Sequence, residues 1–137
     1  MTKEYAISIL KKYTPMPDDQ DLTAEMIDEY ASAILYFEEY PDPSCIEPIM
    51  MTFSLDDLYG TYEHAACVLR SFTNDQVVPH LIKALYSEHE GIRYWGANIA
   101  KFFPDSRLLN PLLNCVNDSN EEIREYATYA RTCIGYK

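Results

Sequence analysis

A pattern of residues recurs along the chain at intervals of 31 positions. The recurrence is clearest at an Ile-Arg pair, and apolar positions around that pair repeat with it. A fixed period of roughly 20–50 residues is the signature of stacked repeat units, each too small to bury its apolar face alone. We therefore expect similar units stacked around one continuous core. The matching positions are Ile92-Arg93 and Ile123-Arg124, Trp95 and Tyr126, Leu81-Ile82 and Met50-Met51, and Phe103 and Phe72.

Each unit carries two apolar stripes separated by a polar break. Within a stripe the apolar residues are three or four positions apart, which places them on one face of a helix. Gly96 and Ala127 occupy the same position in their units, where small residues let two helix backbones approach closely. We therefore expect two helices per unit. The stripes of the middle unit are Val78, Leu81, Ile82 and Leu85, then Ile92, Trp95, Ile99 and Phe103.

Residues 1–43 fit the repeat period poorly, as a terminal capping unit often does. The pattern predicts a helix over residues 2–13 with Tyr5 on its apolar face, then a loop, then a long helix that Thr23 begins. The expected fold class is all-α, with about four antiparallel helix hairpins. Residues 1–43 are expected to form an N-terminal capping hairpin, and residues 44–137 three repeats of the same domain.

Two further helix starts are predicted from local signals. Ser54 or Asp56 is expected to begin the second helix of the first repeat. Gly60 weakens the first turns of that helix by about 1 kcal/mol relative to alanine, so we expect a late start or a kink there. Ser119 and Glu122 have the spacing of a capping box, which predicts the start of the last helix.

The composition fits one soluble domain. A chain of 137 residues with 47% apolar residues can bury a core. No apolar run approaches the ~18 residues of a membrane span, and no basic segment followed by an apolar block begins the chain. The cysteines form no CxxC pair, which favours reduced thiols and a cytoplasmic location. They are Cys45, Cys67, Cys115 and Cys133.

The last unit resembles a known repeat family. Asp118, the pair Ile123-Arg124 and Ala127, after a first helix that contains a proline, are similar to the short HEAT repeats common in bacterial proteins, of the type found in bilin lyases. The resemblance covers about residues 44–134. It implies an α-α superhelix, that is, a HEAT-like solenoid. It indicates almost nothing about function, because such repeats serve as scaffolds in many settings.

The resemblance also implies structural roles for several polar residues. In such repeats the arginine reaches a carboxylate or carbonyl of the neighbouring unit and sets the stacking, a role that we transfer to Arg93, Arg124 and Asp118. Trp95 is expected to fill the space between adjacent hairpins. His64 lies at the same position of its unit as Trp95 and is expected to pack between helices.

The second helices of a stacked array usually line an inner, concave wall. Polar and aromatic positions that the core does not use recur at one phase of these helices, so they are expected to line up across the stack. Tyr94 and Tyr129 are the expected contact residues, because an exposed aromatic with a polar tip binds proteins well. The alternative is that each ring lies half-buried over a neighbouring helix. The candidate wall residues are Glu63, Cys67, Arg70, Tyr94, Asn98, Lys101, Glu125, Tyr129 and Thr132.

Negative charge is concentrated toward the N-terminus. Residues 1–43 hold ten acidic and three basic residues, whereas residues 75–137 hold eight and seven. Capping does not account for Asp18, Asp19 and Asp21, so we expect an acidic face that attracts a basic protein. The alternative is that the acidity only maintains solubility. The chain has no stripe of Lys and Arg, which argues against nucleic-acid binding.

Catalytic and cofactor signatures are absent from the sequence. The three histidines do not have metal-ligand spacing, the four glycines form no phosphate loop, and no serine lies in a GxSxG motif. The favoured hypothesis is a non-catalytic scaffold that binds a protein through its inner wall and acidic face. The alternatives are an immunity or antitoxin protein that neutralises a basic toxin domain, an enzyme or lyase accessory subunit of the bilin-lyase type, and a structural adaptor.

Overall fold

The computed structural model describes residues 1–135. Within that range the chain forms helices and no strand, so the predicted all-α class is confirmed. The α-helices are α1 Lys3–Lys12, α2 Ala24–Glu39, α3 Ile46–Met50, α4 Thr61–Leu69, α5 Asn74–Leu85, α6 Glu90–Ala100, α7 Leu109–Cys115 and α8 Glu121–Cys133. Four short 3-10 helices join them, namely η1 Asp19–Asp21, η2 Pro43–Cys45, η3 Leu58–Gly60 and η4 Ser106–Leu108.

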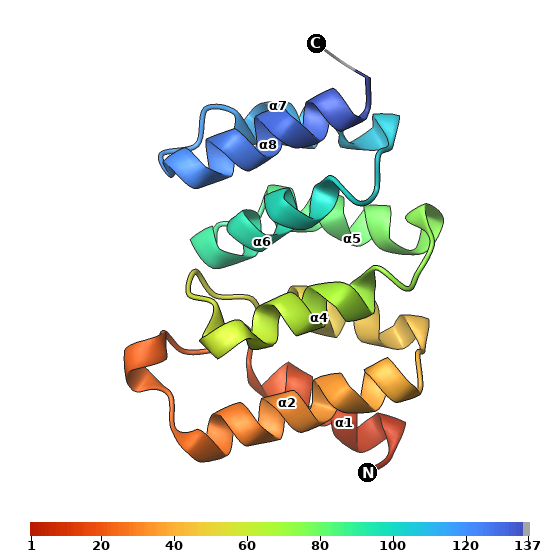
Figure 1. Ribbon diagram of the computed structural model, residues 1–137, viewed down its shortest axis with the longest axis vertical. Helices are drawn as coiled ribbons and strands as arrows, with labels where there is room; N and C mark the ends of the chain where they lie inside the picture. The colour runs from red at the N-terminus through yellow and green to blue at the C-terminus, as the bar shows by residue number, and fades with distance from the viewer. Residues whose placement is uncertain (136–137) are drawn as a thin grey trace.

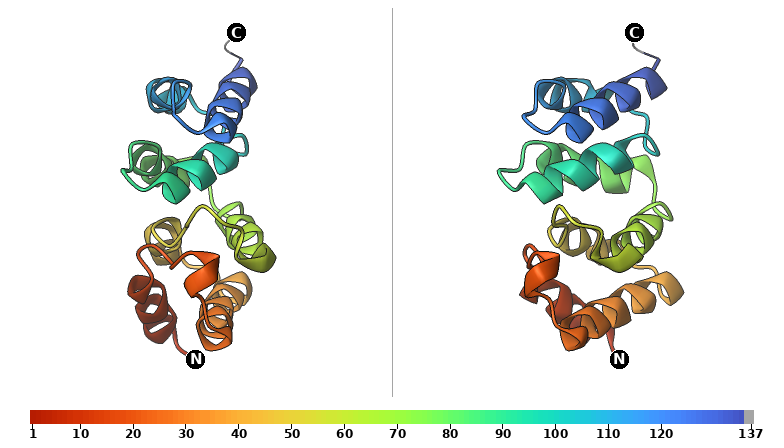
Figure 2. Two further views of the ribbon diagram at one scale, coloured as in Figure 1. Left: turned by 90° about the vertical axis from the view of Figure 1, so that its left-hand side faces the viewer. Right: turned by 60° about the vertical axis from the view of Figure 1, so that its left-hand side comes forward.

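The helices form two layers. Helices α2, α4, α6 and α8 lie one above another at the front of Figure 1, and α1, α3, α5 and α7 lie behind them. The left view of Figure 2 shows the two layers as two columns, with the N-terminus at the bottom and the C-terminus at the top. The exposed side of the front layer is called the second-helix face below, and that of the other layer the first-helix face.

The N-terminal segments begin where their capping residues predict. Thr2 caps α1 by accepting a hydrogen bond from the Tyr5 backbone N–H at 3.1 Å, and Thr23 caps α2 in the same way through Met26. Helices α1 and α2 pack on each other. The placement of Tyr5 on the apolar face was wrong, since its side chain is 53% exposed while Ala6, Ile9 and Leu10 are buried.

Helix α4 begins later than predicted, at Thr61 rather than at Ser54 or Asp56. Gly60 precedes it with a left-handed φ of 87°, which ends the preceding turn. Ser54 does not cap a helix, because its hydroxyl is turned inward and shares a hydrogen bond of 3.0 Å with the Tyr62 hydroxyl. The late start expected at Gly60 is therefore confirmed, and the predicted start at Ser54 or Asp56 was wrong.

The start of α8 also differs from the predicted capping box. Asn120, not Ser119, is the capping residue, and its Oδ1 accepts hydrogen bonds from the backbone N–H groups of Glu122 and Ile123. The Asn120 backbone N–H is in turn held by Asp118 Oδ1 at 3.0 Å. Asn120 is one residue closer to α8 than Ser119, and its side chain satisfies the free N–H groups of the first helical turn.

The connection between α3 and α4 enters the core, and residues 51–57 are called the central loop below. Thr52 and Ser54 are buried polar residues within it. The Thr52 hydroxyl bonds the Tyr30 hydroxyl of α2 at 2.7 Å, and Trp95 of α6 donates its indole N–H to the Ser54 carbonyl at 3.1 Å. Gly91 of α6 lies so close that an added Cβ would come 2.3 Å from the Ser54 carbonyl carbon. The loop therefore contacts α2, α4 and α6, three helices of the front layer.

Aromatic rings surround the central loop. Trp95 stacks on Phe53 with ring centroids 5.5 Å apart, and it meets the edge of Tyr62 at 5.7 Å. Tyr62 also makes edge contacts with Tyr30 and Phe53. Trp95 is only 4% exposed, so the prediction that its ring fills the space between adjacent helix pairs is confirmed.

None of the helices formed by residues 1–135 combines the length and apolarity that a membrane span requires. The longest, α2, has 16 residues, whereas a span needs about 20 apolar ones.

Candidate functional site

A groove of about 240 Å³ opens on the second-helix face between α4 and α6. Five of the predicted wall positions line it, and buried apolar side chains form its floor. The residues from α4 are Glu63, Ala66, Cys67 and Arg70, and those from α6 and its end are Trp95, Asn98, Ile99, Lys101 and Phe102. The structure therefore brings the first two predicted triplets together, with the exception of Tyr94.

The groove exists because α4 packs closely on α2 but not on α6. Figure 2 shows α4, coloured lime, set apart from α6 in the turned views. The central loop and the rings of Phe53, Tyr62 and Trp95 fill the space beneath the two helices. Helices α6 and α8, by contrast, pack along each other.

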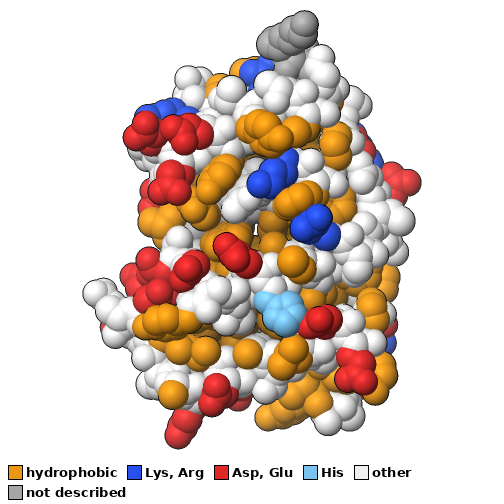
Figure 3. All heavy atoms as spheres, viewed as in Figure 1, with side chains coloured by type: hydrophobic (Ala, Val, Ile, Leu, Met, Phe, Trp, Pro, Cys, Tyr) orange, Lys and Arg blue, Asp and Glu red, His pale blue; other side chains and the backbone are white. Residues whose placement is uncertain are grey.

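Two basic side chains lie at one end of the groove. Arg70 Cζ is 3.7 Å from the centroid of the Phe102 ring, and Lys101 Nζ is 5.1 Å from the same centroid. Within the described residues neither Arg70 nor Lys101 forms an ion pair. In Figure 3 basic groups lie among apolar ones near the middle of this face, while acidic side chains gather along the left margin.

Tyr94 is not the free wall residue that was predicted. Its hydroxyl donates to Glu122 at 3.0 Å, and its ring meets Tyr126 and Trp95 edge-on. Burial raises the pKa of Tyr94, and the Tyr126 hydroxyl and the Glu122 carboxylate raise it further. The half-buried alternative therefore holds for Tyr94, which joins α6 to α8.

The third predicted triplet lies apart from the groove. Tyr129 is 57% exposed on α8. Glu125, Tyr129 and Thr132 line an open hollow of about 490 Å³ together with Val116, Arg124 and Thr128. The expected continuous wall is thus divided into a groove between α4 and α6 and a patch on α8, with Tyr94 packed between them.

The predicted structural arginines both bind the loop before α8. Arg93 Nε donates to Asp118 Oδ2 in the next unit at 2.8 Å, as the resemblance implied, and its Nη1 donates to the Ser87 carbonyl. Arg124 behaves differently. Its Nη1 donates to the carbonyls of Asp118 and Ser119 at 2.8 and 3.3 Å, which belong to its own unit and not to a neighbour.

The Arg93–Asp118 pair is largely buried and charged. Burial of the Asp118 carboxyl acts to raise its pKa, but hydrogen bonds from Arg93 and the Asn120 backbone N–H, with the charges of Arg93 and Arg124, outweigh it and lower the pKa. The net lowering means that the folded protein stabilises the ionised carboxylate. Asp118 therefore connects the two C-terminal helix pairs as an anion.

The acidic N-terminal residues meet a second acidic segment that sequence reasoning missed. The Asp19 backbone N–H donates to Asp56 Oδ2 of the central loop at 3.1 Å, and Met16 N–H donates to the Thr52 carbonyl at 2.9 Å. Asp56 was considered as the start of a helix, which concealed this contact. The residues of this acidic surface are Asp18, Asp19, Asp21, Asp56 and Asp57.

Electrostatic repulsion within the acidic surface is visible at Asp19. Burial raises the pKa of its carboxyl, and the charges of Asp56, Asp57 and Asp18 raise it further. Asp19 Oδ1 has no hydrogen-bond partner. Ionised Asp19 is therefore unfavourable in the folded chain.

His64 does not pack between helices as predicted. Its side chain is partly exposed, and its Nε2 contacts the Glu38 carboxylate of α2. Tyr62, two residues earlier, fills the interior position beside Trp95. The repeat alignment was wrong at this point because the ten-residue connection of residues 51–60 changes how α4 faces its neighbours.

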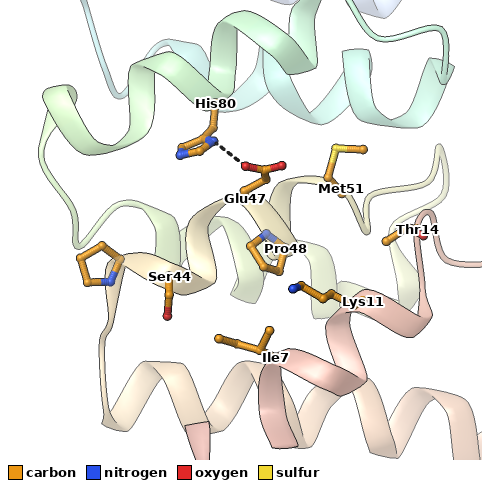
Figure 4. Close-up of a pocket in the computed structure, with 9 residues that line it drawn as sticks. Ile7, Lys11, Thr14, Ser44, Glu47, Pro48, Met51 and His80 are labelled. Atoms are coloured by element: carbon orange, nitrogen blue, oxygen red, sulfur yellow. Dashed lines mark ion pairs between the residues drawn. The ribbon is translucent and has the colours of Figure 1, made fainter. Parts of the chain in front are cut away.

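A second hollow, of about 550 Å³, lies on the first-helix face between α1, α3 and α5. Figure 4 shows Ile7 and Lys11 reaching it from below, Pro48 at its centre and His80 above. His80 Nδ1 lies 3.6 Å from Glu47 Oε2. The sequence contained no signal for this hollow, because its residues come from α1, α3, α5 and the segments beside them, which are separate in the sequence.

Within residues 1–135 no group of three or more His, Cys, Asp or Glu side chains is arranged to hold a metal ion. All four cysteines are free thiols. Burial raises the pKa of the Cys45 thiol to about 12 and that of Cys115 to about 11, so both stay protonated at neutral pH. The candidate site consists of the groove, the α8 patch and the acidic surface.

No family model matches the chain, and no curated protein matches it either. The likeness to short HEAT repeats thus continues to depend on the residues quoted for it.

Proposed function

We propose that the protein is a short HEAT-like solenoid and a non-catalytic scaffold that binds another protein through its second-helix face. The observation that supports this most directly is the groove between α4 and α6, which gathers Glu63, Arg70, Asn98 and Lys101 over an apolar floor. Tyr129 and Glu125 extend the same face onto α8.

The size of the groove favours a protein ligand. Its volume of about 240 Å³ falls below the roughly 300–1,000 Å³ of typical small-molecule sites. A protein partner needs only a few such hollows for anchor side chains, because the rest of its interface can lie on the flat surface around them. Exposed Tyr129 is the kind of aromatic residue that anchors such contacts.

The acidic surface favours a partner that is basic overall. The chain carries a formal charge of −11, and the structure places Asp56 beside Asp19 at the N-terminal half. Like charges held close together create a field that attracts a positively charged protein and speeds its association. The same observation supports a narrower candidate, an immunity or antitoxin protein that neutralises a basic toxin domain.

The partner and its footprint can be determined in one series of experiments. The tagged chain is purified from cells that express it naturally, and hydrogen exchange is measured on the complex and on the free chain. Protection is expected on α4, α6 and α8 and in the acidic surface. Tyr129→Ala is expected to weaken binding by about tenfold or more, the range of interface anchor residues.

The matched control is Lys83→Ala, an exposed residue of α5 in the other layer, which is expected to leave binding unchanged. Protection confined to α5 and α7 would contradict the proposal and would move the interface to the first-helix face. Tyr94→Ala is unsuitable as a binding variant, because Tyr94 packs on Trp95 and Tyr126 and its loss would disturb the fold.

A further inference from the structure

The groove between α4 and α6 has a charge polarity opposite to that of the acidic surface. Arg70 and Lys101 lie at one end, and Glu63 lies on α4 two helical turns before Arg70, about 10 Å away at 1.5 Å per residue. Arg70 and Lys101 form no ion pair within the described residues, although the chain has 22 acidic and 11 basic residues.

Arg70 is held in place without a carboxylate. Its guanidinium lies against the Phe102 ring at 3.7 Å, an arrangement that restricts the side chain and leaves N–H donors available. A guanidinium fixed in this way loses less freedom when it binds a carboxylate in a bidentate manner. This end of the groove therefore suits an incoming acidic side chain.

The floor next to Arg70 is apolar. Ala66, Trp95 and Ile99 are buried beneath it, and Phe102 remains 40% exposed at its edge. An apolar side chain placed here would cover Phe102 and exclude water from the Arg70 contact. Exclusion of water strengthens a charge-assisted hydrogen bond.

We propose that the groove binds a segment of a partner protein in which an acidic side chain is followed closely by a large apolar one. The carboxylate is bound by Arg70 and Lys101, and the apolar side chain lies over Ile99 and Phe102. This inference depends on the proposed function, since it names the chemistry that the second-helix face recognises. The acidic surface attracts the partner from a distance, and the groove selects the segment at contact.

A phage-displayed library of random dodecapeptides provides the test, with the full chain as bait. Selected peptides are expected to contain Asp or Glu within a few residues of Leu, Ile, Phe or Trp. Synthetic copies are expected to bind Arg70→Glu at least about tenfold more weakly, the effect of losing one charge-assisted contact of roughly 1.4 kcal/mol or more. Lys101→Glu is expected to act in the same direction.

Two controls accompany these variants. Lys83→Glu makes the same charge change on exposed α5 and is expected to leave binding unchanged, and Arg70→Lys is expected to retain part of the affinity because the charge is kept. Melting curves of all variants distinguish lost contacts from lost folding.

The inference would be overturned by selected peptides rich in Lys and Arg, or by peptides that bind Arg70→Glu as tightly as wild type. Neither result would contradict the proposed function, which hydrogen exchange tests separately. A library that yields no binder would also overturn it. A wild-type dimer that Arg70→Glu dissociates would show that a second copy of the chain occupies the groove, contrary to the proposal.

Discussion

Two of the junctions between neighbouring helices of the front layer, α6 with α8 and α4 with α6, are packed in different ways. Helices α6 and α8 pack directly on each other, and the Arg93–Asp118 ion pair of 2.8 Å joins their units. Helices α4 and α6 are spread apart, and the central loop and a cluster of rings occupy the space beneath them.

The difference originates in the connection within each helix pair. Residues 116–120 join α7 to α8 by a short turn, whereas residues 51–60 join α3 to α4 by a longer segment. The longer segment turns inward, and its buried polar groups are satisfied by Tyr30, Tyr62 and Trp95. Buried polar groups need such partners, so the loop and the rings depend on each other.

The irregular junction also contains strained backbone. Leu58 and Tyr59 have positive φ values of 50° and 52°, immediately before Gly60. Non-glycine residues in that region cost of order 1–3 kcal/mol each and persist only where the surroundings hold them. Buried Leu58 supplies that hold here. The regular junction is closed by direct helix contact and an ion pair, whereas the irregular one leaves a groove in which Arg70 and Lys101 lie beside an apolar floor.

Removal of the Trp95 ring should break the irregular junction. Trp95→Ala is expected to reduce the free energy of unfolding by about 3–5 kcal/mol, because a large buried side chain is lost from a packed site. Chemical denaturation with urea measures the change. Tyr59→Ala is the control, since Tyr59 is 73% exposed. Equal effects of the two variants would show that the aromatic cluster does not support α4 and α6.

The contact between α6 and the central loop can be tested at Gly91. Gly91→Ala would place a methyl group 2.3 Å from the Ser54 backbone, and an overpacked site typically costs about 1–3 kcal/mol. We expect a loss near the upper end of that range, because backbone cannot move aside as easily as a side chain. Gly96→Ala is the matched control.

The nearest atom to a Cβ at Gly96 would be the Ala84 methyl group at 3.1 Å, so this control is expected to lose less stability. Melting temperatures of the two variants give the comparison. If Gly96→Ala were the more damaging change, the regular α5–α6 contact would be the tighter of the two.

The regular junction can be tested through its ion pair. A double-mutant cycle with Arg93→Ala and Asp118→Ala is expected to give a coupling of about 1.5–3 kcal/mol, the range of hydrogen bonds to charged groups. Because the pKa of Asp118 is lowered in the folded state, its stabilising effect is fully present above the ordinary aspartate pKa of about 3.9.

That effect is lost as the pH falls from there through the lowered folded-state pKa. The free energy of unfolding, measured by denaturation between pH 6 and pH 2, should therefore decline less steeply for Asp118→Asn than for wild type. Parallel curves for the two proteins would mean that the carboxylate carries no special stability in the fold.

The smallest expected effect on stability concerns the acidic surface. Asp18→Asn, Asp19→Asn and Asp21→Asn together should leave the melting temperature equal or slightly higher at neutral pH, since the raised pKa of Asp19 shows that its ionised form is unfavourable in the fold. Protonation removes the same repulsion as the pH falls, so the difference from wild type should shrink toward acid pH.

The same triple variant should associate several-fold more slowly with the co-purified partner at low salt. The difference should disappear near 1 M salt, where the Debye length is about 3 Å. Stopped-flow association rates against ionic strength measure it. Identical salt dependence for variant and wild type would leave the acidic surface a role in solubility alone.

The sequence by itself determined the helical class, the positions of most helices and the inward-facing residues. Spacings of three and four residues mark a helix face wherever a helix forms, so the buried positions Leu81, Ile92 and Trp95 could be predicted locally. Capping by Thr23 is likewise a contact between residues adjacent in sequence. The Arg93–Asp118 pair could be foreseen only through the resemblance to short HEAT repeats, which implies an arginine that reaches the neighbouring unit.

Only the tertiary structure decided how the units meet. Whether residues 51–60 begin a helix or enter the core depends on Tyr30 and Trp95, which are distant in sequence and supply the hydrogen bonds that make a buried loop stable. The same contacts spread α4 from α6 and so create the groove at Arg70. The spacing of apolar residues in the sequence indicates which side of a helix is apolar. The distance between two helices depends instead on the side chains and backbone that fill the space between them.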